Sequence, residues 1–139
     1  MISLAKRAYQ SAAFDSRVET GDKRDLIVMM YDAALDALRL AREHLVRQEH
    51  RETSTALARA MTVLHGLRNS LDFDKGGAVA AHLNDFYEYF IRKLTAVDRK
   101  STAEITDCED LLSQVREAWV AISPNAAEQV TRRLFVVHG

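Results

Sequence analysis

Apolar residues cover most of the circumference of the segment that follows Asp22. They form two stripes at helical spacing. One stripe is Leu26, Met30, Ala33, Ala37, Ala41 and Leu45, and the other is Ile27, Tyr31, Leu35 and Leu38. No proline or glycine interrupts the chain from Asp22 to Arg47. A helix that is apolar on so many sides must be surrounded by other helices. We therefore expect a central helix that begins at the N-cap Asp22 and has Met30 in its core.

A second segment, which begins near Thr53, also has two apolar lines. They are Leu57, Met61, Leu64 and Leu71 on one side, and Ala56, Ala60, Val63 and Leu67 on the other. The charged stretch 47–52 before it is expected to be a loop or a frayed helix end. The turn-forming composition of residues 72–77, which include Gly76 and Gly77, ends the segment.

Two more segments complete the helical pattern. The first has a core stripe that consists of Val79, Leu83, Phe86, Phe90, Leu94 and Val97. Tyr87 and Ile91 lie beside this stripe and widen it. The second begins at a capping box of Ser101 and Glu104. Its core stripe continues to the end of the segment: Ile105, Cys108, Leu112, Val115, Trp119 and Ile122. Ser123 and Pro124 then predict the N-cap and first position of a short fifth helix.

These segments predict an all-α fold organised in three parts. Residues 1–21 lack helical periodicity and are expected to form an N-terminal arm that carries Tyr9. Residues 22–122 are expected to form a four-helix bundle. Residues 123–139 are expected to form a C-terminal extension with the short helix.

The composition narrows the classes of function. A net charge near −1 gives no reason to expect binding to nucleic acid or to an anionic membrane. No apolar run approaches the ~20 residues of a membrane span, and the N-terminus lacks the apolar stretch of a secretory signal. The single cysteine, Cys108, cannot form an internal disulfide. A reducing, cytoplasmic environment is therefore expected.

The residues that carry chemistry do not form a catalytic or metal-binding pattern. The five histidines are scattered, and neither His-Glu-x-x-His nor Glu-x-x-His occurs. Cys108 lies on a core stripe, where a cysteine usually acts as a small apolar residue. We therefore expect no metal, no cofactor and no catalytic cysteine.

One alternative function remains open at this point. His65-Gly66-Leu67-Arg68 lies on a helix of the expected bundle, as the reactive histidine of histidine phosphotransfer domains does. Arg68 could replace the lysine of that motif, but Asn69 stands where a glycine is expected. A signalling bundle that uses His65 is therefore the alternative to a protein-binding bundle.

The second and third segments carry more apolar surface than a bundle needs. One line from each is sufficient for the core, so the other lines are expected to form a partner-binding groove. The residues of this predicted groove are Ala60, Val63, Leu67, Tyr87 and Ile91.

Several motifs, taken in order, resemble one known family. Tyr9-Gln10 lies in the short arm, and the first helix opens with Leu-x-x-Met-Met-Tyr-Asp-Ala-Ala-Leu from Leu26 to Leu35. The turn 71–77 precedes Leu-Asn-Asp-Phe-Tyr-Glu-Tyr at 83–89, and the last long helix ends in Val-Arg-Glu-Ala-Trp at 115–119. Over residues 9–122 the chain resembles the flagellin-specific export chaperones of bacterial flagella, the FliS family.

The resemblance implies an antiparallel four-helix bundle without enzymatic activity. Such a protein would bind the disordered C-terminal segment of flagellin in the cytoplasm and prevent its premature polymerisation. It would then deliver flagellin to the flagellar type III export apparatus, and other flagellar export or regulatory proteins are further possible partners. Amphipathic client helices would lie in the groove, and the arm with Tyr9 is expected to cover part of it.

Overall fold

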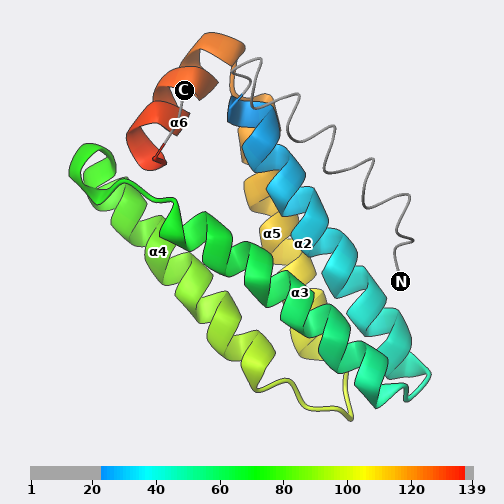
Figure 1. Ribbon diagram of the computed structural model, residues 1–139. Helices are drawn as coiled ribbons and strands as arrows, with labels where there is room; N and C mark the ends of the chain where they lie inside the picture. Colours follow the sequence, from blue (N-terminus) through cyan, green and yellow to red (C-terminus); the bar gives the residue numbers. More distant parts are fainter. Residues whose placement is uncertain (1–22, 137–139) are drawn as a thin grey trace.

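The computed structural model describes residues 23–136 and has five helices in this part of the chain. They are α2 (Lys23–Val46), α3 (His50–Asn69), α4 (Phe73–Thr95), α5 (Ala103–Ala121) and α6 (Pro124–Leu134) (Figure 1). The predicted all-α fold and the short helix after Ser123 are confirmed. The predicted arm, 1–21, and the N-cap Asp22 lie outside the described residues.

Ion pairs reveal the direction of α5 relative to α2. Arg42 Nε donates to Glu109 Oε1 at 2.8 Å, and Arg116 donates to Asp32. Residue numbers rise along one helix as they fall along the other, so the two helices are antiparallel. Guanidinium–carboxylate pairs of this kind are directional and help to set the register between helices.

Side-chain contacts also reveal the direction of α4 relative to α3. Arg68 Nε donates to Asn84 Oδ1 at 3.1 Å, and Thr95 Oγ1 lies 3.3 Å from Met61 Sδ. α3 and α4 are therefore antiparallel too. Since α2 packs on α3 and α5, and α4 packs on the same two helices, α2 and α4 occupy diagonal corners of the bundle.

α2 has a buried face along its length, but it occupies a corner of the bundle, so the prediction of a central helix surrounded by the others is wrong. The buried residues of α2 are Ile27, Tyr31, Ala34, Ala37, Leu38, Ala41 and Leu45. This line runs between the two predicted stripes, because the neighbouring helices cover the middle of the apolar arc. Met30 is therefore only partly buried and Ala33 is exposed, so the prediction that Met30 belongs to the fully buried core is wrong.

Two tyrosines meet at the centre of the bundle, across its diagonal. The hydroxyls of Tyr31 on α2 and Tyr87 on α4 are 2.6 Å apart, and neither residue has exposed surface. Burial raises the pKa of Tyr31 to about 12 and also raises the pKa of Tyr87. Each neutral hydroxyl supplies the hydrogen-bond partner that the other needs in an apolar interior.

We expect the replacement of Tyr87 by Phe to destabilise the fold by about 1–3 kcal/mol, because the Tyr31 hydroxyl is left buried without this partner. The double variant Tyr31→Phe/Tyr87→Phe should lose less than the sum of the two single variants, since no lone hydroxyl remains. Urea unfolding followed by circular dichroism measures all three free energies. Strictly additive losses would show that the two hydroxyls are not coupled.

The connections differ from their prediction at three places. Before α5, Ser101 Oγ accepts the backbone N–H of Ala103 at 3.1 Å, so the predicted capping box with Glu104 is not formed. α3 begins at His50, so the second half of the charged stretch 47–52 is helix and the link is a tight turn with Gln48 at φ +59°. Residues 73–76 form a helical turn, capped where Asp72 accepts the backbone N–H of Lys75 at 3.0 Å. The break comes at Gly77, whose φ of +54° and ψ of −131° favour glycine strongly.

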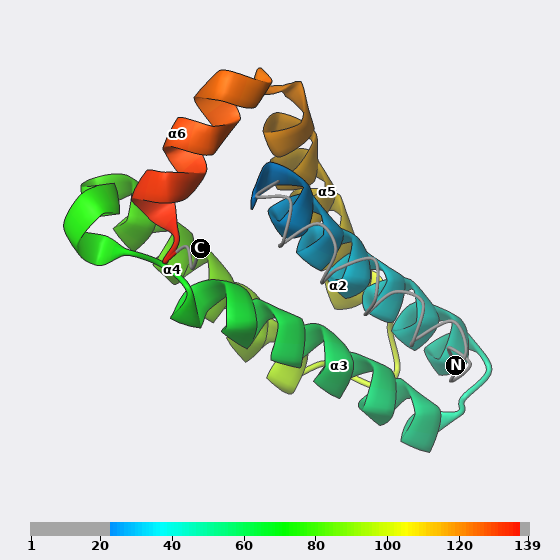
Figure 2. The same ribbon diagram turned by 45° about the horizontal axis from the view of Figure 1, so that its top comes forward.

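α6 crosses the end of the bundle where the pair α2 and α5 diverges from the pair α3 and α4 (Figure 2). An antiparallel β-bridge between Leu71 and Phe135 holds the C-terminal end of α6 against the α3–α4 connection. Its two hydrogen bonds run from Asp72 N–H to Leu134 O and from Val136 N–H to Ser70 O, both at 2.6 Å. The ring of Phe135 lies 5.9 Å from that of Trp119. The C-terminal extension therefore closes the core at this end.

Candidate protein-binding surface

The predicted groove on α3 and α4 is mostly interior. Ala60, Leu67 and Tyr87 have no exposed surface and belong to the core. The expectation that these three line an open groove is therefore wrong for the described structure. The physical reason is that both apolar lines of α3 are covered, one by α4 and the other by α2.

Val63 and Ile91 keep part of their surface exposed, but they lie in different places. The side of α3 with Met61 and Arg68 contacts α4. Val63 is two residues from Met61, about 200° around the helix, and so lies on the flank toward α2. Ile91 lies four residues before Thr95 and shares its side of α4, which faces α3. The structure does not bring Val63 and Ile91 together into one groove.

A different apolar surface lies between α4 and α5, which touch each other less than the other adjacent pairs of the bundle do. The Lys93 Nζ and Asp107 Oδ2 atoms are 3.7 Å apart and set the register. Tyr89 precedes Lys93 by one helical turn and Leu111 follows Asp107 by one turn. Because α5 runs antiparallel to α4, Tyr89 and Leu111 lie at the same level of the pair, and they are 43% and 38% exposed.

We call this surface the α4–α5 seam and define it by Leu83, Phe86, Tyr89, Leu111 and Val115. Leu83, Phe86 and Val115 are partly buried against the core. Tyr89 is held in place on its own helix, with Lys93 Nζ 3.2 Å from its hydroxyl and 5.4 Å from its ring centre. The seam can accept the apolar face of a partner helix, since it is an apolar strip with an ordered aromatic side chain at its edge.

The apolar stripe predicts Leu83 and Phe86 in the core and carries no expectation for Leu111. Tyr89 lies off the main stripe, which favours an exposed position at the edge of a groove. A second signal is the pair Leu111-Leu112, because adjacent side chains on a helix point about 100° apart and Leu112 already lies on the core stripe.

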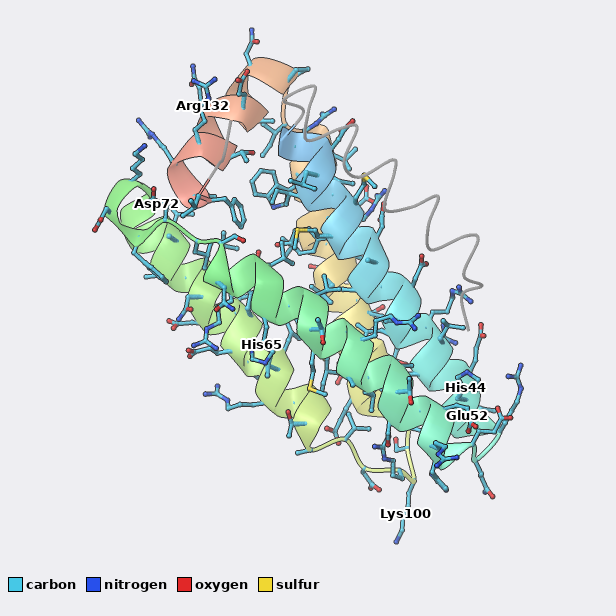
Figure 3. All side chains as sticks on the ribbon, viewed as in Figure 1. His44, Glu52, His65, Asp72, Lys100 and Arg132 are labelled. Atoms are coloured by element: carbon cyan, nitrogen blue, oxygen red, sulfur yellow. The ribbon has the colours of Figure 1, made fainter. Side chains whose placement is uncertain are left out.

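The features relevant to chemistry are not arranged as a reactive site. His65 is exposed on α3 (Figure 3), but Arg68 is engaged with Asn84 and with Glu88 Oε1 at 3.2 Å. Burial raises the pKa of the Cys108 thiol to about 11, so it is protonated at neutral pH and a poor nucleophile. Among residues 23–136, no three His, Cys, Asp or Glu side chains gather in a way that could hold a metal ion.

Comparison with known proteins decides the family. The model of the flagellar protein FliS family matches residues 5–126, which is most of the chain. The chain belongs to the FliS family. The resemblance noted in its motifs is thereby confirmed.

Relatives in other bacteria agree with this assignment. The flagellar secretion chaperone FliS of Salmonella typhimurium is 36% identical over 128 residues, covering 91% of this chain and 95% of the relative. FliSB of Pseudomonas aeruginosa is 28% identical over 86% of this chain and 95% of its own length. FliS of Escherichia coli is 25% identical over 81% and 85% of the two chains.

Membership in the FliS family agrees with the helical fold and places the chain among flagellar secretion chaperones. It implies a protein that works by binding a flagellar export substrate rather than by catalysis. Within residues 23–136, no helix has both the length and the apolar character to cross a bilayer.

Proposed function

We propose that this FliS-family protein is a cytoplasmic chaperone that binds the C-terminal segment of flagellin. It would prevent premature polymerisation and deliver flagellin to the flagellar type III export apparatus. The observation that carries this proposal is the α4–α5 seam of a FliS-family bundle, an apolar strip that the fold leaves partly open. An apolar strip between two helices fits the helix-in-groove mode of peptide recognition.

The physics of such binding suits a chaperone that must release its client. A client segment that is disordered when free must become ordered on the seam, and this ordering costs part of the interaction energy. Burial of the exposed faces of Tyr89 and Leu111 contributes to affinity, and the partly buried Phe86 and Val115 provide a rigid floor. The result is specific binding that remains reversible.

We also propose that three of the predicted partner-binding residues contribute to client binding. Ile91 and Val63 offer partly exposed apolar surface beside the α3–α4 and α2–α3 contacts. Tyr9 lies outside the described residues, and its proposed role is to cover part of the client surface in the free protein.

We expect that Tyr89→Glu and Leu111→Lys each weaken flagellin binding by about tenfold or more, because each buries an unpaired charge under the client helix. The two charges have opposite sign, so a general electrostatic effect on the client would move the affinities in opposite directions. Isothermal titration with a peptide of the flagellin C-terminal segment measures the dissociation constants. Circular dichroism should show wild-type helicity and melting, since both side chains lie at the surface and neither belongs to the buried core.

The matched control is Val120→Lys. Val120 is 44% exposed on the same helix as Leu111 but nine residues away, which places it on the opposite side of α5. The affinity of the Val120→Lys variant for the flagellin peptide should stay within about twofold of wild type, since this side of α5 lies outside the seam. Unchanged affinity in both seam variants would move the client site elsewhere, and absence of flagellin binding by the wild type would refute the proposed function.

A further inference from the structure

A second open surface lies on the α2–α3 side of the bundle, near the turn that joins the two helices. It is a cleft of about 360 Å³, enough for one aromatic side chain. It is lined by Leu40 and His44 of α2 and by Arg51, Glu52, Thr55, Ala56 and Arg59 of α3. His44 and Glu52 lie at this end of the molecule (Figure 3). Leu40 and Ala56 supply the apolar part of the lining.

The rim of the cleft has two arginines and only one carboxylate, that of Glu52. Neither Arg51 nor Arg59 has an ion-pair partner among residues 23–136. His44 is already engaged, since its Nδ1 lies 3.0 Å from Glu49 Oε1. Glu52 lies in the first turn of α3, where the helix dipole stabilises a carboxylate. The unbalanced charge around the cleft is therefore positive.

The two arginines frame the apolar part of the cleft. They are eight residues apart on α3, which corresponds to about 12 Å along the helix axis. Thr55 and Ala56 lie between them, opposite Leu40. A helix with two acidic residues about two turns apart, and one large apolar residue midway between them, would match this spacing.

We propose that this cleft docks an acidic amphipathic helix of a second protein. Its large apolar side chain enters between Leu40 and Ala56, and its two carboxylates pair with Arg51 and Arg59. Guanidinium–carboxylate pairs at the rim orient the ligand helix, and the apolar residue in the middle supplies the anchor.

The cleft and the α4–α5 seam lie on opposite faces of the bundle. α2 packs on α3 and α5, and α4 packs on the same two helices, so the α2–α3 side is opposite the α4–α5 side. A client on the seam leaves the cleft free, and the protein can hold flagellin and a second protein at once. This last step rests on the proposed function, whereas the chemistry of the cleft does not.

The test uses a designed helical peptide of about 15 residues, long enough to have some helicity in water. It carries two Glu about two turns apart with Phe midway, and a control peptide has Lys in place of Glu. In amide NMR spectra of the full chain, the Glu peptide should shift the signals of Leu40, His44, Thr55 and Ala56. Arg51→Glu/Arg59→Glu should weaken its binding by about tenfold or more, and the Lys peptide should not bind the wild type.

Two further variants make the result specific. Arg92→Glu/Arg133→Glu, which replaces two exposed arginines on α4 and α6, is the charge-matched control and should leave the peptide affinity unchanged. Thr55→Trp fills the cleft from an exposed position and should block the peptide without a change in rim charge. Equal affinity of the Glu peptide for the double arginine variant and the wild type would overturn the proposal.

Flagellin binding separates this inference from the proposed function. The arginine double variant should bind the flagellin peptide like wild type, and protein saturated with flagellin should still bind the Glu peptide. If the double variant also loses flagellin, the cleft belongs to the client site and the proposal of a second partner is wrong. If the wild type binds the Glu peptide but not flagellin, only the proposed function fails.

Discussion

Trp119→Ala should lower the free energy of unfolding by about 3–5 kcal/mol, the usual cost of truncating a buried tryptophan. Trp119 is only 4% exposed, and its ring packs against Phe135 where α6 closes the end of the bundle. The truncation leaves a cavity between α5 and the C-terminal segment. Thermal melting by circular dichroism should show a midpoint lower by about 10–15 °C for a domain of this size.

The same variant separates stability from binding. Trp119 lies in the core and not on the seam, so flagellin binding should fall only in proportion to the unfolded fraction. Trp119→Phe keeps most of the buried area and should lose clearly less stability. A Trp119→Ala protein that melts like wild type would mean that the contact between α5 and the C-terminal segment is not formed as described.

Gly76→Ala should destabilise the fold by about 2–3 kcal/mol through overpacking. A Cβ at position 76 would lie 2.7 Å from Ala80 Cβ, 3.0 Å from the carbonyl oxygen of Arg133 and 3.1 Å from Leu134 Cδ2. Neither a backbone carbonyl nor an alanine Cβ can rotate away. α6 and the β-bridge behind it must shift, and chemical denaturation of the purified variant measures the cost.

Gly66→Ala is the matched control for this prediction. Gly66 lies within α3, and a Cβ there would meet only Met30 Cε at an ordinary 3.5 Å. Alanine favours the helix over glycine by roughly 1 kcal/mol, so this variant should be as stable as wild type or more stable. If both alanine variants are stabilising, the close approach of α6 to residue 76 does not exist in solution.

Apolar periodicity by itself determined that four long helices form, but not that α2 takes a corner of the bundle instead of its centre. Trp119 and Cys108 could be assigned to the core from their stripe alone, because one-sided burial of a helix leaves a stripe at helical spacing. The ordered motifs were sufficient to indicate the FliS family. Apolar stripes and short motifs depend only on the spacing between residues that are close in the chain, and this spacing can be read from a single sequence.

The direction in which each helix turns its apolar arc was decided only by the tertiary structure. Ala60, Leu67 and Tyr87 are interior, while Leu111 is exposed and Phe86 only partly covered. Periodicity gives the angular width of the arc but not the positions of the neighbouring helices, which determine the part that remains open. The return of α6 to residues 70–76 likewise depends on contacts between segments far apart in sequence. The α2–α3 cleft depends on how closely the two helices of that hairpin pack.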